Sequence, residues 1–541
     1  MSAIHRSGLK FSSVKLSVTL LAVMAMAMGM AHALEAPASL GAEDARHLLA
    51  RTGFGPTQAE IRTYAGLTRK EAVARMLGEV HRTAGLAPPA WIDEAITSPR
   101  EIRNAPEERR AELRQQENQL NNRRTFELRA WWINEMLATP APLVERMTLF
   151  WHNHFTSSQQ KVRFAQLMYR QNALLRENAL GNFATLLHAA SKDPAMIIYL
   201  DSASNRRDKP NENFAREVME LFTLGEGNYS ETDIREAARS FTGWSVDIDS
   251  GAFVYRRAVH DYGSKTILGK SGRFDGDEVL DILLTQTRTA EYIVEKMWRE
   301  FVSPLPERKE VQRVARAFRD SGYEIKVALR ELLLAPAFWA DDNRAVLVKS
   351  PAEFVVGTLR QFDVPVPDAT PFAFVMAGLG QNLFAPPNVK GWAGGEAWIN
   401  SATLLARKQF VERLFRADEM ARPRMAQGMA QGMDAMEGME MAAAAAKGGP
   451  LPIVPIRGRA AANAVTAANS APAAAPGAPR RAAPAGPIFD GQRWFSGFSG
   501  QRDPAVEQLV LAAAPANPVP AEVAGREWLR HLTLDPAYQL K

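Results

Sequence analysis

The chain of 541 residues contains no cysteine. This absence excludes disulfide bonds, thiolate nucleophiles, thiolate metal ligands and the covalent attachment of a c-type haem. A protein without disulfides must be stabilised by its hydrophobic core instead. A chain of this length can bury a large core.

The chain also lacks a strong excess of charge of either sign. Lys and Arg number 65 and Asp and Glu 60, which gives a formal net charge of +5. Arg6, Lys10 and Lys15 lie in the first 33 residues, which hold no acid, so the remainder carries 62 basic against 60 acidic residues, or +2. This balance argues against a general nucleic-acid-binding protein, and no nucleic-acid partner is expected.

Three well-known catalytic motifs are missing as well. The sequence contains no G-x-S-x-G nucleophile elbow, no P-loop and no H-E-x-x-H zinc motif. The segment Asp247-x-Asp249-x-Gly251 has only the opening of a calcium-binding loop and lacks its spacing. These motifs therefore do not indicate which reaction, if any, the protein catalyses.

The first residues are typical of a signal peptide. Basic residues precede an uncharged, mostly apolar run over 16–30, and Ala31-His32-Ala33 is a small-x-small cleavage site. The run is short for a membrane span, which makes a retained N-terminal anchor the weaker interpretation. We expect residues 1–33 to be removed, no stable membrane span to remain after cleavage, and the mature protein to be periplasmic or secreted.

Apolar residues recur mostly at helical spacing, which predicts a mainly α, bundle-like single domain. Helix starts are indicated by an N-cap followed three residues later by an acid at Thr57, Ser230 and Ser350. Short β-like pieces at 253–255 and 266–268, separated by a turn, predict one small hairpin.

The composition changes sharply near residue 422. Residues 422–487 are rich in Met and then in Ala, Pro and Gly, and little in them can bury a core. We interpret them as a disordered insertion within one domain, with a main helical domain over 34–421 and a C-terminal segment, 488–541, that packs back on it. The clustered methionines could capture Cu(I), although low-complexity drift explains them as well.

The densest pattern of polar residues among apolar ones is the stretch Lys209–Trp244. In its first helix, Glu217 and Glu220 are three residues apart and neighbours beside an apolar stripe. Such carboxylates could hold a divalent cation or act as an acid–base pair. The alternative is that they form ion pairs with arginines of the same stretch, namely Arg216, Arg235 and Arg239.

Three histidines complete a candidate metal or catalytic site. On a strand or turn, His152 and His154 would point the same way and could share a metal, whereas on a helix they diverge by about 200°. His260, followed by Asp261 in a loop, is a candidate ligand or acid–base group, unless Asp261 only caps a turn. Together with Glu217 and Glu220 these histidines would make a mixed nitrogen and oxygen site for a divalent metal ion.

Four further residues are candidates for substrate binding. Trp392 and Trp398 lie in a loop rich in Gly and Pro and could stack on sugars, or they could plug the core. Asn211 and Asn213 precede the helix of the two glutamates and could line the same cavity or cap that helix.

Several ordered segments resemble the bacterial exported family known as domain of unknown function 1800. They are HLLARTGFGPT (47–57), WHNHFTSS (151–158), NENFAREVMELFTLGEGNYSETDIREAARSFTGW (211–244), HDYGSKTILG (260–269), LVKSPAEFVVGTLRQF (347–362), PPNVKGWAGGEAWINSATLLAR (386–407) and DPAYQLK (535–541). The resemblance covers nearly all of the mature chain except the insertion. It implies a mostly helical exported protein, commonly encoded beside an exported sulfatase- or phosphatase-like protein, and it implies no reaction.

Three functional hypotheses follow. The first is a metal-dependent enzyme, a hydrolase or lyase acting on envelope or extracellular polymers, with Glu217, Glu220 and His260 as catalytic residues and His152, His154 and Glu217 as metal ligands. The second is a non-catalytic helical binding partner of the exported sulfatase-like protein. The third is a copper-handling protein that works through its Met-rich insertion.

Overall fold

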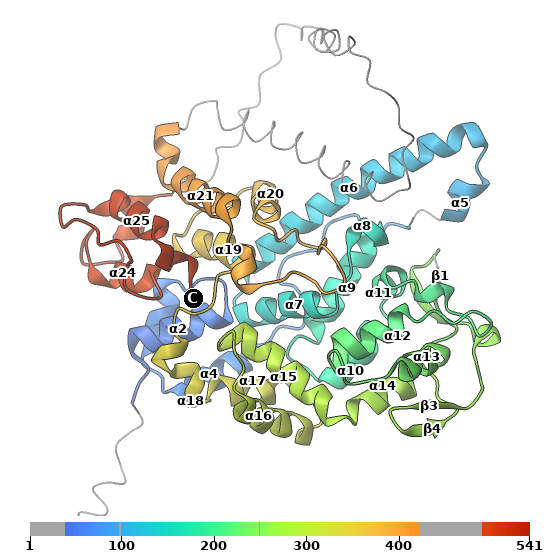
Figure 1. Ribbon diagram of the computed structural model, residues 1–541. Coiled ribbons are helices and arrows are strands. Elements are labelled where there is room, and N and C mark those ends of the chain that lie inside the picture. Colours follow the sequence, from blue (N-terminus) through green and yellow to red (C-terminus); the bar gives the residue numbers. More distant parts are fainter. Residues whose placement is uncertain (1–37, 97–98, 248, 421–488) are drawn as a thin grey trace, which may run out of the picture.

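The computed structural model describes residues 38–96, 99–247, 249–420 and 489–541, and in these residues the protein is mostly helical (Figure 1). The predicted signal peptide (1–33) and the Met-rich insertion (422–487) lie outside the described residues. No helix in the described ranges combines the length and the apolar character that crossing a membrane requires.

The N-terminal part of the chain is built from helices alone. They are α2 (Gly41–Thr52), α3 (Gln58–Ala65), α4 (Arg69–Gly78), α5 (Pro99–Asn104), α6 (Glu107–Ala138), α7 (Pro142–His154), α8 (Gln159–Val162), α9 (Ala165–Glu177), α10 (Phe183–Ser191) and α11 (Pro194–Tyr199). The long helix α6 reaches outward from the body, whereas α7 runs through its middle (Figure 1).

The central part combines helices with short strands. Its elements are η1 (Ser202–Ser204), α12 (Asn213–Glu217), the π-helix η2 (Val218–Thr223), α13 (Glu231–Ser240), β1 (Trp244–Asp247), β2 (Ala252–Tyr255), η3 (Arg257–Val259), β3 (Lys265–Ile267), β4 (Lys270–Gly272) and α14 (Gly276–Leu284). All four strands lie together at one end of the molecule (Figure 1).

The remainder is again helical. It comprises α15 (Thr287–Phe301), α16 (Arg308–Asp320), α17 (Ile325–Leu333), α18 (Pro336–Trp339), η4 (Asp341–Asn343), α19 (Pro351–Gln361), α20 (Thr370–Gly378), η5 (Gly395–Trp398), α21 (Ser401–Met420), α23 (Gly491–Phe495), α24 (Pro504–Val510), α25 (Gly525–Leu534) and η6 (Pro536–Gln539).

The predicted helix starts are confirmed by their hydrogen bonds. The side chains of Thr57, Ser230 and Ser350 each accept a bond from the backbone N–H three residues on, and the acid at that position bonds back to the cap. Each reciprocal pair satisfies two backbone donors that a helix start leaves open, which is why this local pattern locates the helix so reliably.

The β structure differs in its pairing from the single expected hairpin. The two β-like pieces do form strands, β2 and β3, but each pairs with another neighbour, so that β1 pairs with β2 and β3 with β4. The helical turn η3 separates β2 from β3. The turn between β3 and β4 is tight because Leu268 and Gly269 both adopt positive φ angles, which closes a local hairpin at low cost in chain entropy.

Two hydrophobic cores meet along α7. The first gathers side chains such as Trp151, Phe183 and Trp298 from α7, α10 and α15. The second gathers side chains such as Trp132 and Phe354 from α6 and α19, together with others from α20, α21 and α25. Because α7 contributes to both cores, most of its side chains are buried, including its charged ones.

The last residues of the chain lie inside the molecule. Helix α25 packs against α21, and Lys541 donates its backbone N–H to the carbonyl of Leu347 at 2.9 Å. An isolated bridge joins Val348 to Leu540. Figure 1 places the C-terminus between α2 and α19. The C-terminal segment therefore forms part of the wall of the central region.

Candidate functional site

The helix that carries the two candidate glutamates changes its winding between them. Glu217 ends α12, and Glu220 lies in the π-helix η2. The Leu224 N–H donates to the carbonyl of Met219, five residues back, at 2.8 Å. The wider turn is rare, and such turns occur frequently at functional sites. It also alters which side chains can meet across the helix.

The two carboxyl groups have unequal surroundings. Glu220 accepts a hydrogen bond from the Tyr229 hydroxyl at 3.0 Å, and the Lys390 ammonium lies 3.7 Å from its other oxygen. Burial, and then the negative charge of Glu220, raise the pKa of Glu217, while Lys390 and Arg216 act in the opposite direction. A carboxyl group with a raised pKa beside one that has a hydrogen-bond donor and a nearby cation is an arrangement suited to acid–base chemistry.

The arginines of the central stretch do not hold these carboxylates. Arg216 pairs with Glu231 at 2.8 Å and with Glu212 at 3.4 Å, and Arg235 donates to the Thr232 hydroxyl. Arg239 pairs with Glu236 and Asp261 instead. In the described part of the chain, therefore, neither Glu217 nor Glu220 forms an ion pair with these arginines.

The histidines of α7 lie on opposite sides of a continuous helix. The His152 Nε2 is 3.0 Å from the amide nitrogen of Asn172, and its ring packs on Trp132. On the other side, His154 Nε2 contacts the Phe222 carbonyl at 3.2 Å and Nδ1 contacts the Lys296 ammonium at 2.9 Å. The helix does not break at Asn153 to bring the two rings together.

Burial disfavours the charged form of both of these histidines. Burial, and then the charge of Arg176, lower the pKa of His152 to about 3. Burial, and then the charge of Lys296, lower the pKa of His154 well below its usual value. With Nε2 donating to the carbonyl, His154 offers Nδ1 as the acceptor for Lys296, so each ring serves as a hydrogen-bonding residue of the core.

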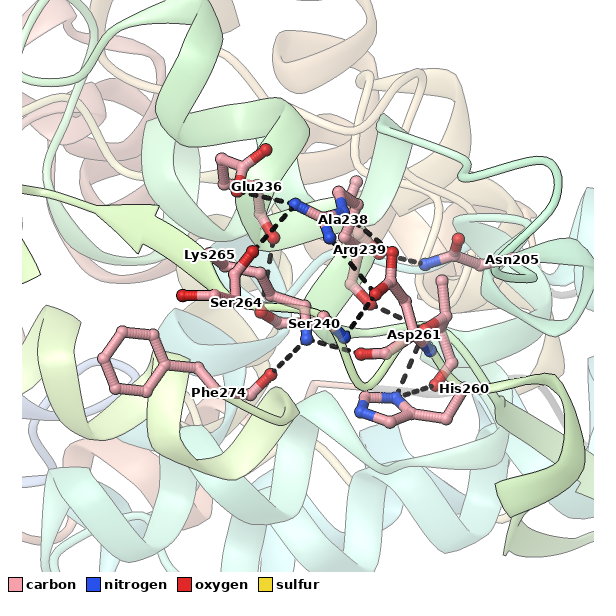
Figure 2. A network of polar contacts seen from close by, with 12 residues as sticks. Asn205, Glu236, Ala238, Arg239, Ser240, His260, Asp261, Ser264, Lys265 and Phe274 are labelled. Atoms are coloured by element: carbon pink, nitrogen blue, oxygen red, sulfur yellow. Dashed lines mark hydrogen bonds and ion pairs between the residues drawn. The ribbon is translucent and has the colours of Figure 1, made fainter. Parts of the chain in front are cut away.

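His260 lies in a separate polar network (Figure 2). Its Nδ1 is 2.9 Å from the Thr242 carbonyl and 3.2 Å from the hydroxyl of the same residue. Beside it, Asp261 accepts bonds from Arg239 at 2.7 and 3.2 Å, and those bonds lower its pKa. Asp261 also accepts the Gly263 N–H at 2.8 Å, so it both pairs with an arginine and caps the turn.

The structure does not bring the predicted metal ligands together. Within the described residues there is no group of three or more His, Cys, Asp or Glu side chains that could hold a metal ion. His152, His154 and Glu217 each have a different neighbourhood, and Nε2 of His152 and both ring nitrogens of His154 already have hydrogen-bonding partners. These residues do not fit a divalent metal ion in the arrangement that the sequence suggested.

The two candidate asparagines organise the loop before α12. Asn211 donates its amide to the Asp201 carbonyl and accepts the Asn213 N–H at 3.0 Å. Asn213 donates to the Leu200 carbonyl at 3.0 Å. Their side chains position this loop, whereas the N-cap residue of α12 is Glu212, whose side chain makes no capping hydrogen bond.

The tryptophans of the 386–400 loop are buried and line one cavity. This cavity has a volume of about 90 Å³, and Trp392 and Trp398 form one side of it. Arg146, Glu353 and Lys541 form another side. The tryptophan rings therefore act as walls against the core, and they are not exposed platforms.

Asn153 joins this loop to α7. Its side-chain oxygen accepts the Trp392 N–H at 2.7 Å, and its amide donates to the Trp392 carbonyl at 3.3 Å. Gly391 approaches so closely, at a φ of +82°, that a Cβ there would lie 2.1 Å from the Asn153 oxygen. One loop thus places Lys390 beside the glutamates and Trp392 in the cavity.

Sequence reasoning missed several residues that the structure places at these sites. Tyr229 and Lys390 contact Glu220, but the sequence analysis assigned neither residue a function. Glu353 was identified only as the acid of a capping box, although it also binds Arg146 at 2.8 Å and Lys541. A buried, charged N3 residue in an otherwise apolar helix is the signal that could have identified it.

Together, the fold and the sites define a mostly helical protein with a partly buried carboxyl pair and a cavity lined by charged side chains. The model of the family described as protein of unknown function (DUF1800) matches residues 47–539, and the chain belongs to this family. No curated protein matches the chain. No solved structure matches it.

Proposed function

We propose that the protein is an exported hydrolase or lyase acting on polymers of the cell envelope or the extracellular space, with Glu217 and Glu220 as its acid–base pair. The observation that carries this proposal is the inequality of two neighbouring carboxyl groups at a π-turn. Burial and a like charge favour the protonated form of Glu217. Glu220 has a hydroxyl donor in Tyr229 and a nearby cation in Lys390.

The roles follow from the unequal surroundings of the two carboxyl groups. In a hydrolase, Glu217 gives its proton to the leaving oxygen while Glu220 takes a proton from the attacking water. In a lyase, Glu220 abstracts the proton beside the departing group and Glu217 protonates that group. Neither step is assigned to a metal ion, because the predicted ligands do not converge.

The loop that carries Lys390 is the positioning element of this proposal. The Lys390 side chain is 67 % exposed, so its ammonium group can contact a bound substrate in addition to Glu220. Asn153 fixes the loop two residues further on through Trp392. A polymer bound over the π-turn would therefore meet both carboxyl groups and an exposed cation.

The test compares the purified protein with Glu217→Gln and Glu220→Gln. Glu226→Gln is the matched control, because Glu226 is an exposed acid of the same stretch. A panel of envelope and extracellular polymers is assayed for new reducing ends, which report hydrolysis, and for unsaturated ends, which report elimination. Removal of an acid or base should lower the rate by roughly 100-fold or more, and a chelator should leave the rate unchanged.

Other outcomes would contradict the proposal. Full activity of Glu217→Gln or Glu220→Gln would exclude the pair as catalytic residues. If no polymer is cleaved and the protein instead forms a stoichiometric complex with the exported sulfatase-like protein encoded nearby, it is a non-catalytic binding partner. If deletion of 422–487 alone abolishes copper binding, the copper-handling role belongs to the insertion.

A further inference from the structure

The cavity beside Trp392 lies where separate parts of the chain meet. Its walls come from α7, α15, α19, the 391–398 loop and the last residue, Lys541. A second cavity of about 20 Å³ lies on the other side of Glu353 and Lys541, which line both. The two cavities therefore share one charged wall.

Basic side chains dominate the surroundings of this wall. The buried ones are Arg46, Arg51, Arg146, Arg407 and Lys541, and Lys349 is partly buried beside them. The acids that pair with them are Glu353, which binds Arg146 and Lys541, and Glu300, which binds Arg146. Among these side chains, six basic groups surround two acidic ones, although Arg51 and Arg407 line neither cavity.

Three of these cations bond only to neutral oxygen atoms in the described residues. Arg51 donates to the carbonyls of residues 301, 302 and 343. Lys349 donates to the Tyr538 carbonyl, and Arg407 to the Lys349 carbonyl and the Gln539 side chain. Burial lowers the pKa of Arg51 to about 9 and that of Arg407 to about 10, as expected where positive charge lacks compensation.

Donors without acceptors also border the cavity. Arg299 lines it from α15 and is exposed, and among the described residues its guanidinium has no hydrogen bond or ion pair. Trp392 also lines it, and its indole N–H is buried with no acceptor. Lys541 adds an ammonium with three N–H donors, which Glu353 alone does not exhaust.

We propose that this cavity binds a phosphate or sulfate group, with Arg299, Trp392 and Lys541 as donors. Such a group has several acceptor oxygens and no donor requirement, which matches a wall of unused N–H groups. Its negative charge would offset the excess of buried positive charge. Two carboxylates, Glu300 and Glu353, also line the cavity. They do not repel the group strongly, because Arg146 pairs with both and Lys541 pairs with Glu353.

The proposed donors Arg299, Trp392 and Lys541 include neither member of the proposed acid–base pair. The experiment titrates the full protein with inorganic phosphate and with inorganic sulfate by calorimetry, at constant ionic strength set with chloride. The variants are Arg299→Gln, which changes an exposed residue and leaves the core intact, and Lys541→Met, which keeps the aliphatic part of the side chain. Lys309→Met, at an exposed position of α16, is the control, and Glu220→Gln should bind as the wild type does.

We expect saturable binding that weakens roughly tenfold or more in Arg299→Gln and in Lys541→Met and stays unchanged in Lys309→Met. A parallel titration with glucose 6-phosphate and glucose 6-sulfate separates the two sources of the group. Tighter binding of an ester than of the free ion assigns the cavity to an esterified ligand, and the reverse assigns it to the free ion. Absence of saturable binding, or equal weakening in the control, overturns the proposal.

Discussion

Asn153 and Trp392 are joined by two hydrogen bonds, and the one from the Trp392 N–H to the Asn153 oxygen is 2.7 Å long. This contact ties the end of α7 to a loop 239 residues further along the chain. The loop carries Lys390 toward Glu220 and the Trp392 ring into the cavity. Both candidate sites therefore depend on one amide side chain.

Replacement of Asn153 by Ala should loosen this loop. The Trp392 N–H and carbonyl lose their partners, which costs about 1–3 kcal/mol of the free energy of unfolding. Denaturant unfolding measures this loss, and faster hydrogen exchange over 386–400 locates it. Asn153→Asp keeps the acceptor and should lose less. Equal exchange in all three proteins would show that the loop is held by other contacts.

Gly391 and Gly394 make a matched pair for testing close packing. Both have positive φ angles, +82° and +75°, but a Cβ at Gly391 meets Asn153, whereas a Cβ at Gly394 has nothing within 4 Å. Gly394 has a ψ of −177°, a backbone conformation that essentially only glycine adopts, so Gly394→Ala should cost about 1–3 kcal/mol through backbone strain alone. Gly391→Ala should cost clearly more because the side chain of Asn153 must move. Equal losses in thermal unfolding would contradict the close approach.

The pKa of Glu217 should depend on its neighbour. Because the charge of Glu220 helps to raise that pKa, Glu220→Gln should lower it toward the usual value for a glutamic acid. Titration of the carboxyl carbon signals by NMR measures this change, and Glu226→Gln is the control. An unchanged pKa in Glu220→Gln would mean that burial alone determines the protonation of Glu217.

We expect His188 to make a pH-dependent contribution to the stability of the fold. The hydrogen bond to Asp277, and then the one to Asp281, raise its pKa although burial opposes them. The protonated form therefore stabilises the fold at pH values below the unfolded pKa of about 6.5, and this contribution disappears as pH rises through the folded pKa. We expect His188→Gln to lose up to about 1 kcal/mol at pH 5.5 and little at pH 9, in chemical denaturation. The exposed His81→Gln should show no such difference.

Removal of the ionisable group at Asp193 should stabilise the fold, whereas its removal at His188 should destabilise it. Burial raises its pKa to about 7, although it caps α11 through the Met196 N–H and accepts a bond from Gln171. Its contribution to stability is present below the unfolded pKa of about 4 and is lost as pH rises toward 7. Asp193→Asn keeps an oxygen for the cap. Its free energy of unfolding should exceed that of the wild type by about 2 kcal/mol at pH 8 and should differ little from it at pH 4. A variant that is less stable at pH 8 would show that the carboxylate itself is needed.

Local patterns made much of the fold predictable. The caps at Thr57, Ser230 and Ser350 act within four residues, so their side chains identify the helix starts without any tertiary information. The same holds for the β-branched and aromatic pieces that became β2 and β3. Their pairing was not predictable, because each strand had two possible neighbours and the helical turn η3 decided between them.

The candidate site was predictable only in part. Glu217 and Glu220 are close in sequence and share a helix, so their proximity could be inferred, whereas the π-turn between them could not. Because α7 continues through both His152 and His154, their side chains point in different directions, and the sequence alone left this open.

The sequence by itself determined the helical class, the helix starts, the family and the lack of any thiol chemistry, because composition and short-range spacing suffice for these. Only the tertiary structure decided that Arg146, Glu353 and Lys541 share one wall. These residues lie far apart in the chain, and a buried charge finds its partner through packing, for which no local pattern provides a signal.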